Sequence, residues 1–472
     1  MNLSVITRVF GVAAMVLSVF TYAQDKAELP EQTLFKNVNV FNGVDKQLYK
    51  NYFVLVEKNR IKAVSPEPIA ANAKAVVVDG SGRTLMPGLI DAHVHLNLQY
   101  LNNPAAIDGV SNMTWEEIGA MAYDAAQEFL YSGFTTVRDL CGMHDGMRKH
   151  IESGTLIGPR MYLAGACISQ TSGHGDWRTN AQVLGDDGNK VGQVQALGIT
   201  TLADGADEVL KACRNNLAGG ADFCKMMAGG GVTSMRDPLH SIQGTMDELK
   251  AMVTATSQWD TVGAVHAYHD DSVERALKAG MMSIEHGNLM VKKSTFKLVK
   301  KKGAFVVPAM AGFSEQLLKH PQYGNPDLPL RGKVMQIIEN YDNWLKLANE
   351  TNINIGYGTD VVVSSKLASR GIRDFQMGQF SEGFGNYKTL VALTSANGRL
   401  MALTGKNNPY PAKLGVIEQG AYADIILVDG NPLEDISVLG ASFDMWAAPR
   451  ASREIKSIPF VMKDGQVFLN KL

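Results

Sequence analysis

A repeated pattern that starts at Leu89 constrains the fold of this chain most strongly, because short apolar segments alternate there with helical ones. The apolar runs predict buried strands, and the segments between them have helical periodicity. One helix, Thr114 to Gly133, has a capping-box start at Thr114–Glu117 and a terminal glycine. Eight strand–helix units are the number that closes a parallel barrel, so we predict a (β/α)8 TIM barrel in the α/β class. The predicted strands are 89–95, 134–140, 160–166, 222–228, 262–268, 282–288, 304–310 and 353–360.

Further helices are predicted between these strands, and β-rich segments flank the barrel on both sides. The helices include 207–220, 245–260, 271–280, a lysine-rich segment before residue 304, 335–350 and 387–405. Before Leu89 and after residue 414, apolar and polar residues alternate between turn signals, as in antiparallel strands. We predict that the two flanks pair into one small β-sandwich domain. The predicted domains are a signal peptide at 1–23, the first sandwich part at 24–86, the barrel at 87–408 and the second sandwich part at 409–472.

The N-terminus has the pattern of a secretory signal. Arg8 precedes an apolar run from Val9 to Phe20, and Ala23 supplies a small residue near the expected cleavage site. The run is short for a membrane span. We therefore predict a periplasmic or secreted protein without stable membrane insertion after removal of the signal. An uncleaved membrane anchor is the alternative.

Composition narrows the possible partners. The chain of 472 residues is 45% hydrophobic and 19% charged, has a net charge of −2 and lacks a basic block, which excludes nucleic acid as an expected partner. We expect a homo-oligomer that acts on a small-molecule or dipeptide substrate. The four cysteines show no CxxC spacing, so buried thiols are expected rather than a cysteine metal site; they are Cys141, Cys167, Cys213 and Cys224. Disulfide pairing in an exported protein is the alternative.

Metal-ligating residue types gather at the carboxyl ends of the predicted strands, where barrels of this kind carry their active sites. His93 and His95 share one side of the first strand, because residues i and i+2 of a strand point the same way. The complete set is His93, His95, Lys225, His266, His286 and Asp360. Imidazole and carboxylate ligands suit zinc or a similar divalent ion. Because six candidates exceed the needs of one ion, two ions are expected.

Lys225 lies in an otherwise apolar strand, where an unpaired lysine is rare. An ammonium group would repel a metal ion. Burial favours the neutral amine, which can react with carbon dioxide to form a carbamate whose two oxygens bridge two ions. We predict a carboxylated Lys225. The alternative is an unmodified lysine paired with Asp360 or with a substrate carboxylate.

The chain resembles the amidohydrolase superfamily in "MPGLIDAHVHL", "KMMA", "VHAY", "SIEHGN", "YGTD" and the closing segment "GVIEQGAYADIILVDGNP". The loop "CISQTSGHGD" is similar to the branch of imidazolonepropionase-like metallopeptidases, which includes Xaa-Pro and Xaa-Lys/Arg dipeptidases, carboxypeptidase-like enzymes and ochratoxin-hydrolysing amidases. The resemblance covers nearly the whole chain after the signal. It implies a binuclear zinc site in which His93, His95 and Asp360 hold one ion, His266 and His286 hold the other, and carboxylated Lys225 bridges them.

Residues around this set are candidates for catalysis and substrate binding. Asp360 is expected to carry the proton from water to the leaving amine, and His174 to polarise the carbonyl or bind a carboxylate. Tyr268 shares the inward face of His266 and could bind the substrate or simply pack. His240 and Arg236 follow the fourth strand as weaker substrate-binding candidates, and a solvated loop position is the alternative for Arg236.

The expected function is hydrolysis of an amide bond in a dipeptide or N-acyl amino acid with a free carboxylate. Related deaminases have a glutamate three residues after the histidine of the fifth strand, but His269 stands there in this chain. The lysine of the fourth strand also favours hydrolysis over deamination. Alternatives are a cyclic amide hydrolase of the imidazolonepropionase kind, a lactone hydrolase, and a metal-dependent binding protein without turnover.

Overall fold

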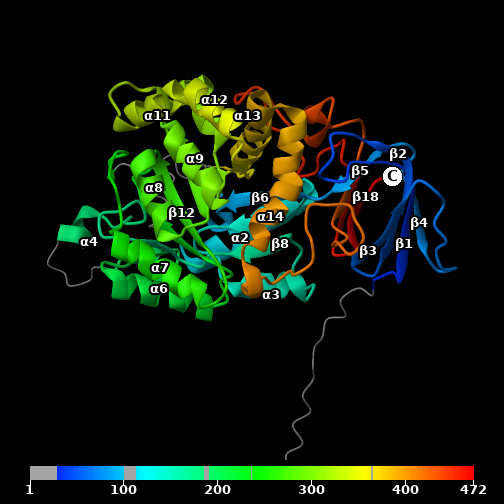
Figure 1. The fold of residues 1–472 in the computed structure, drawn as a ribbon, viewed down its shortest axis with the longest axis horizontal. Coiled ribbons are helices and arrows are strands. Elements are labelled where there is room, and N and C mark those ends of the chain that lie inside the picture. Colours follow the sequence, from blue (N-terminus) through cyan, green and yellow to red (C-terminus); the bar gives the residue numbers. More distant parts are fainter. Residues whose placement is uncertain (1–28, 100–112, 185–190, 235, 363–364) are drawn as a thin grey trace, which may run out of the picture.

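The structure is a computed structural model that describes residues 29–99, 113–184, 191–234, 236–362 and 365–472 (Figure 1). The predicted signal peptide at 1–23 lies outside these residues. Among the helices that are described, none combines the length and the apolar character needed to cross a membrane.

Parallel strands follow one another as the sequence predicts. They form two ladders, β6-β7-β8 and β11-β12-β13-β14-β15. Backbone hydrogen bonds connect the ladders at both ends: Asp222 N donates to Leu163 O at 2.8 Å, and Ala92 N donates to Tyr357 O at 2.9 Å. The arrangement is a TIM-barrel-like α/β fold. Its strands are β6 (Leu89–Val94), β7 (Phe134–Asp139), β8 (Arg160–Leu163), β11 (Cys224–Met227), β12 (Gly263–His269), β13 (Ser283–Leu289), β14 (Phe305–Val307) and β15 (Asn354–Ile355).

Two short strands that were not predicted from the sequence extend the second ladder. These are β9 (Cys167–Ser169) and β10 (Thr200–Leu202), which pair in parallel, and β9 also pairs with β11 through Ile168 and Met226. A turn at Gly165, where φ is 70°, separates β9 from β8. The segment that carries His174 therefore leaves from a strand and not from a free loop.

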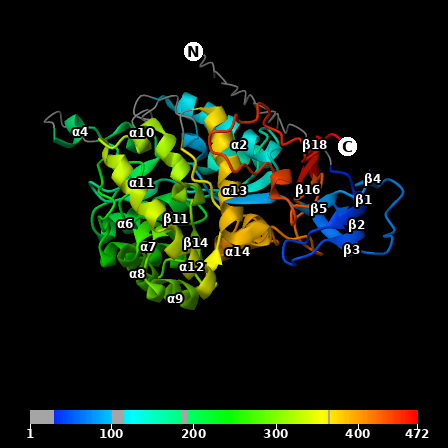
Figure 2. The ribbon, with the colours of Figure 1, turned by 90° about the horizontal axis from the view of Figure 1, so that it is seen from above.

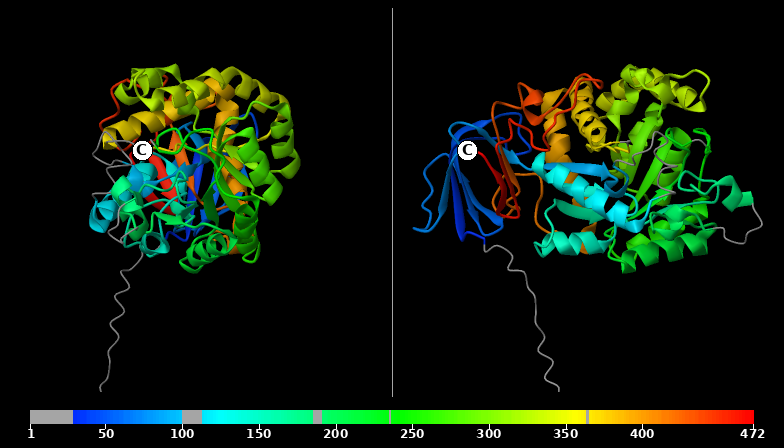
Figure 3. Two further views of the ribbon diagram at one scale, coloured as in Figure 1. Left: turned by 90° about the vertical axis from the view of Figure 1, so that its left-hand side faces the viewer. Right: turned by 180° about the vertical axis from the view of Figure 1, so that it is seen from behind.

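Helices surround the strands on their outer side (Figure 3). The first, α2, has the predicted capping box between Thr114 and Glu117. The helices are α2 (Trp115–Tyr131), α3 (Asp145–Glu152), α4 (Asn180–Leu184), α5 (Gln193–Ala196), α6 (Ala206–Ala218), α7 (Met246–Ser257), α8 (Asp270–Ala279), α9 (Lys293–Lys302), α10 (Pro321–Gly324), α11 (Pro329–Glu339), α12 (Tyr341–Thr351), α13 (Lys366–Val391) and α14 (Asn397–Ala402).

The predicted helix 335–350 differs from the observed ones, and the predicted helix 387–405 is preceded by a helical segment that was not predicted. The first is divided between α11 and α12 at Asn340, whose side-chain amide donates to the carbonyls of Asn288 and Met290 at 2.8 and 3.2 Å. The second starts two residues after Gly385, whose φ of 77° interrupts α13, and continues through a π-helical turn at Ala392–Ala396 into α14. The part of α13 from Lys366 to this kink was not predicted.

A separate, smaller sheet combines both ends of the described chain (Figure 2). Its strands are β1 (Gln32–Val40), β2 (Tyr49–Glu57), β3 (Arg60–Ser65), β4 (Val76–Asp79), β5 (Thr84–Pro87), β16 (Ile425–Val428), β17 (Phe460–Lys463) and β18 (Gln466–Asn470). Strand β5 pairs with β1 on one side and with β16 on the other. Ile61 of β3 bonds back to Ala421 and Gly420, so the sheet folds over a core that includes Phe35 and Ile425. Only Gly88 separates β5 from β6, the first strand of the barrel-like fold.

The cysteines form disulfides, so the expectation of buried thiols was wrong. Cys141, after β7, joins Cys167 at the start of β9, and Cys213 of α6 joins Cys224 of β11. Their Cα atoms lie 4.8 and 5.8 Å apart, within the range that a disulfide bridges. The partners are 26 and 11 residues apart in sequence, and only the packing of neighbouring elements brings them together.

We expect thiol titration of the denatured, unreduced protein to find no free cysteine, and reduction to release all four. Replacing both Cys213 and Cys224 by alanine should lower the free energy of unfolding by about 2–4 kcal/mol, because the disulfide restricts the unfolded chain. Urea unfolding without reductant measures this loss. Four titratable thiols before reduction would contradict the pairing.

Candidate functional site

The carboxyl ends of the parallel strands bring two histidines and an aspartate together. His93 stands on β6, His95 just beyond it, and Asp360 after β15. The Nε2 atoms of His93 and His95 lie 3.2 and 3.1 Å from Oδ1 of Asp360. One nitrogen or oxygen atom from each of the three residues lies within 4.8 Å of the others, which is a possible metal site. We call these residues the His93 cluster.

An unusual backbone conformation sets the direction of two side chains of the site. His286 and Asp360 adopt left-handed φ values of 75° and 49°, which are uncommon for residues other than glycine. Side chains normally alternate along a strand, yet Glu285 and His286 both reach the interior of the barrel-like fold. Nδ1 of His286 consequently lies 3.8 Å from Oδ2 of Asp360. Such a conformation costs on the order of 1–3 kcal/mol per residue and occurs preferentially at functional sites.

Lys225 lies beside the His93 cluster on β11. Its side chain is almost completely buried, and Nζ lies 3.4 Å from Nε2 of His93. Among the described residues, no carboxylate reaches ion-pair distance of Nζ, so the alternative pairing with Asp360 is absent there. Burial lowers the pKa of Lys225, which favours the neutral amine.

His266 and His286 form a second pair of imidazoles next to the cluster. Their ring centroids are 4.6 Å apart, and Nε2 of His266 lies 3.3 Å from Gly230 O. Burial lowers the pKa of both rings well below the usual range. The neutral imidazole is the form that binds metal ions. Nδ1 of His286 is buried without a hydrogen-bond partner among the described residues, as expected of a nitrogen reserved for a ligand. The donor set therefore fits divalent ions.

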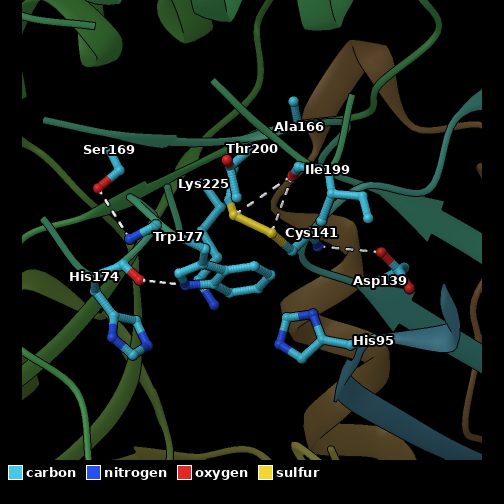
Figure 4. Close-up of a disulfide and its surroundings, with 12 residues drawn as sticks. His95, Asp139, Cys141, Ala166, Ser169, His174, Trp177, Ile199, Thr200 and Lys225 are labelled. Carbon is cyan, nitrogen blue, oxygen red and sulfur yellow. Dashed lines mark hydrogen bonds between the residues drawn. A yellow bond between two sulfur atoms is a disulfide. The ribbon is translucent and has the colours of Figure 1, made fainter. Parts of the chain in front are cut away.

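Two aromatic rings cover these imidazoles. His174 stacks on His266 with a centroid distance of 4.2 Å, and Tyr268 stacks on His286 at 4.7 Å. In Figure 4, His174 and Trp177 lie near the Cys141–Cys167 disulfide, with Lys225 and His95 in the same region. The indole of Trp177 donates to His174 O at 2.7 Å. The structure thus places both His174 and Tyr268 against proposed ligands.

The His174 ring is fixed from behind by the loop after β11. Its Nδ1 lies 3.0 Å from Oδ2 of Asp237, which also accepts the Gly231 amide at 2.6 Å. A Cβ atom on Gly231 would come within 1.9 Å of the ring, so only glycine fits there. Lys333 of α11 donates to the carbonyls of Gly231, Ser234 and Asp237 at 2.7–2.8 Å and holds the loop closed.

The two weaker candidates lie apart from this group. Arg236 is exposed and donates to Arg178 O, and His240 is exposed near His269. Neither side chain contacts the His93 cluster among the described residues. His269, at the position of the deaminase glutamate, precedes α8 instead of joining the ligands.

Four residues of this region were missed by the sequence analysis. Asp237 contacts His174, and Lys333 holds the loop that carries Asp237. Arg138 and Glu285 lie beneath His93, where Oε2 of Glu285 is 3.1 Å from Nδ1 of His93. One signal was available, because Glu285 and Arg138 are charged residues inside predicted strands, as Lys225 is. No comparable signal marks Asp237 or Lys333.

Comparison with known proteins agrees with the geometry. The chain is 29% identical over 397 residues to an ochratoxinase from Aspergillus niger, covering 81% of this chain and 75% of that protein. A prolidase solved with N-methylphosphonate-L-proline is 29% identical with a TM-score of 0.77, and a Xaa-Pro dipeptidase with bound methionine is 28% identical with a TM-score of 0.76. Both comparisons cover 93% of this chain and 100% of the solved chain.

The sequence profile described as "Amidohydrolase family" matches residues 84–466, which include the whole barrel-like region and, from the small sheet, β5, β16 and β17. The resemblance expected from the motifs is thereby confirmed, and the chain belongs to the amidohydrolase family.

Proposed function

We propose that the protein is an exported, binuclear zinc-dependent amidohydrolase that cleaves dipeptides or N-acyl amino acids with a free carboxylate. Membership of the family makes the chain a hydrolase of carbon–nitrogen bonds. The observation that carries the proposal is the His93 cluster with Lys225 and two neutral imidazoles beside it. Similarity to a prolidase, a Xaa-Pro dipeptidase and an ochratoxinase supports this substrate class.

Six residues would hold the ions. His93, His95 and Asp360 would bind one, His266 and His286 the other, and a carboxylated Lys225 would bridge them. When bound, divalent ions polarise a carbonyl and lower the pKa of water towards neutrality. The distance of 3.4 Å between Lys225 Nζ and His93 Nε2 supports a role for Lys225 at the metal site.

The side chains around the ions have separate tasks. Asp360 accepts the proton of the attacking water and gives it to the leaving amine, because its carboxylate faces three imidazoles at the centre of the site. His174 is held by Asp237 with its ring over His266, and so can donate to the carbonyl or to the substrate carboxylate. Tyr268, stacked on His286, offers a hydroxyl for the same purposes.

Several finer features belong to the same proposal. We infer a closed (β/α)8 barrel at 87–408 with a β-sandwich from 24–86 and 409–472, and the hydrogen bonds between the two ladders support it. Removal of residues 1–23 would release the protein into the periplasm or medium. The two disulfides favour such an oxidising compartment. We expect a homo-oligomer. Cyclic amide or lactone hydrolysis with the same ligands is the second candidate.

We expect elemental analysis of the active enzyme to find two divalent ions per chain, and intact mass to show carbon dioxide added at Lys225. The Lys225→Ala variant should lose the bridging group and with it most of the metal and activity. A short carboxylic acid should restore part of both, because it can occupy the space of the carbamate. A single metal in fully active enzyme, or a bare lysine, would contradict the binuclear site.

The Asp360→Asn variant should keep the fold and at least one ion but lose at least 10²–10⁴-fold in kcat, the usual contribution of a positioned acid–base group. The amide retains the shape of the carboxylate and removes its basic oxygen. Steady-state kinetics and metal content are measured on the same preparation. A variant with near-normal kcat would exclude Asp360 as the proton carrier.

A substrate with a free C-terminal carboxylate should exceed its C-terminal amide by roughly 10²-fold in kcat/KM. Two unpaired buried donors cost about 1–3 kcal/mol each, and 1.4 kcal/mol corresponds to a factor of ten. Tyr268→Phe and His174→Asn should narrow this gap by slowing the acid more than the amide.

The control for this comparison is Tyr387→Phe, which removes an exposed hydroxyl bonded to Val44 O and should leave the ratio unchanged. If Arg236→Ala or His240→Ala reduces the ratio of kcat/KM between acid and amide, the loop after β11 recognises the carboxylate. Equal rates on acid and amide with the wild-type enzyme would favour the cyclic amide or lactone reaction.

A further inference from the structure

A charged network lies directly beneath the His93 cluster. Glu285 is completely buried, and its Oε1 accepts hydrogen bonds of 2.7 Å from both Nη2 of Arg138 and the hydroxyl of Ser283. Arg138 is fixed in turn, because its Nε donates to Ala92 O at 2.7 Å and its Nη1 to Ser283 Oγ at 3.0 Å. One carboxylate oxygen is therefore fully engaged on the side away from the site.

The other oxygen faces a ligand of the cluster. Oε2 of Glu285 lies 3.1 Å from Nδ1 of His93, within ion-pair distance, and accepts no aligned hydrogen bond among the described residues. An ionised carboxylate can only accept, so Nδ1 must carry the proton of the neutral ring. The lone pair is then on Nε2, which points to Oδ1 of Asp360 at 3.2 Å and to Lys225 Nζ at 3.4 Å.

We propose that Glu285, fixed by Arg138 and Ser283, is a positioning residue that selects the metal-binding tautomer of His93 and so raises the metal affinity of the cluster. This inference rests on the proposed metal site. His93 alone in the cluster has a carboxylate at its second ring nitrogen among the described residues, since Nδ1 of His95 has no hydrogen-bond partner. Histidine ligands in metal sites are commonly oriented by a carboxylate in this manner.

Arg138 also keeps the network charged and oriented. Nη2 of Arg138 lies 2.7 Å from Oε1, so the buried carboxylate is paired with a positive charge. The same guanidinium determines how the side-chain amide of a glutamine at position 285 would be oriented. The amide oxygen would have to face Arg138 and Ser283, which both donate, and the NH2 group would face His93. The proton of His93 would then move to Nε2, the nitrogen needed for the metal.

The test is metal affinity, measured by competition with a chelator for Zn²⁺ in wild-type protein and in Glu285→Gln. We expect the dissociation constant to rise by 10–100-fold, the usual consequence of losing such a carboxylate. Ser283→Ala, which removes one hydrogen bond to Oε1 and little volume, should raise the constant several-fold and serves if Glu285→Gln does not fold.

The matched control is Glu128→Gln. Glu128 is likewise buried and accepts two 2.7 Å hydrogen bonds from one arginine, Arg370, but it joins α2 to α13 and has no contact with the cluster. This variant should lower thermal stability and leave the Zn²⁺ affinity unchanged. Equal affinity of wild type and a folded Glu285→Gln or Ser283→Ala, or an equal loss in Glu128→Gln, would overturn the inference. Wild-type protein that binds no Zn²⁺ would instead overturn the proposed function.

Discussion

The candidate site depends on charges that are buried among the parallel strands and neutralised by one another. An isolated charge in such surroundings costs several kcal/mol, so each one needs a partner or a change of protonation. Arg138 compensates Glu285, Glu285 faces His93, and His93 faces Asp360. Lys225 is the member without a carboxylate partner among the described residues, and its lowered pKa is the physical response to that position. The positions of the ligands therefore depend on the ion pair between Arg138 and Glu285.

Two left-handed residues complete this arrangement. With regular alternation, β13 could place either Glu285 or His286 in the interior, but not both. The φ of 75° at His286 lets one strand supply a support and a ligand in consecutive positions. Asp360 has a similar conformation, and its amide donates to His93 O at 2.8 Å, so the first and last strands are joined at the residue that contacts three imidazoles.

Much of this could be predicted from local patterns. Apolar runs predicted the parallel strands. The histidines of β6, β12 and β13 could be identified as candidate ligands because such residues are rare in predicted buried strands. Helix α13 was missed between Lys366 and Tyr387, since it buries Arg370 and Arg373 where an apolar stripe would be expected. Arg370 is paired with Glu128, 242 residues away, and Arg138 with Glu285, 147 residues away. Such polar cores are recognisable only when the partner is known. The disulfides and the break at Asn340 depend on tertiary neighbours in the same way.

The small sheet connects both ends of the described chain to the strand that carries His93. Strands β5 and β6 are separated by Gly88 alone, whose amide donates to Asp424 O at 2.9 Å, and a Cβ atom there would come within 2.2 Å of Thr135. Because a single residue joins the two strands, β5 and β6 cannot shift independently of each other. A slip in the register between β5 and β16 would be carried through Gly88 into β6 and would displace His93, five residues further on. Strand β5 can pair with β1 early, but its other edge stays unpaired until β16, more than 300 residues later, has been made, as the Thr84–Gly430 bond across 346 positions illustrates. Assembly of the ligand set is therefore coupled to a contact between distant parts of the chain, a topology that slows folding and leaves a strand edge unpaired in the meantime.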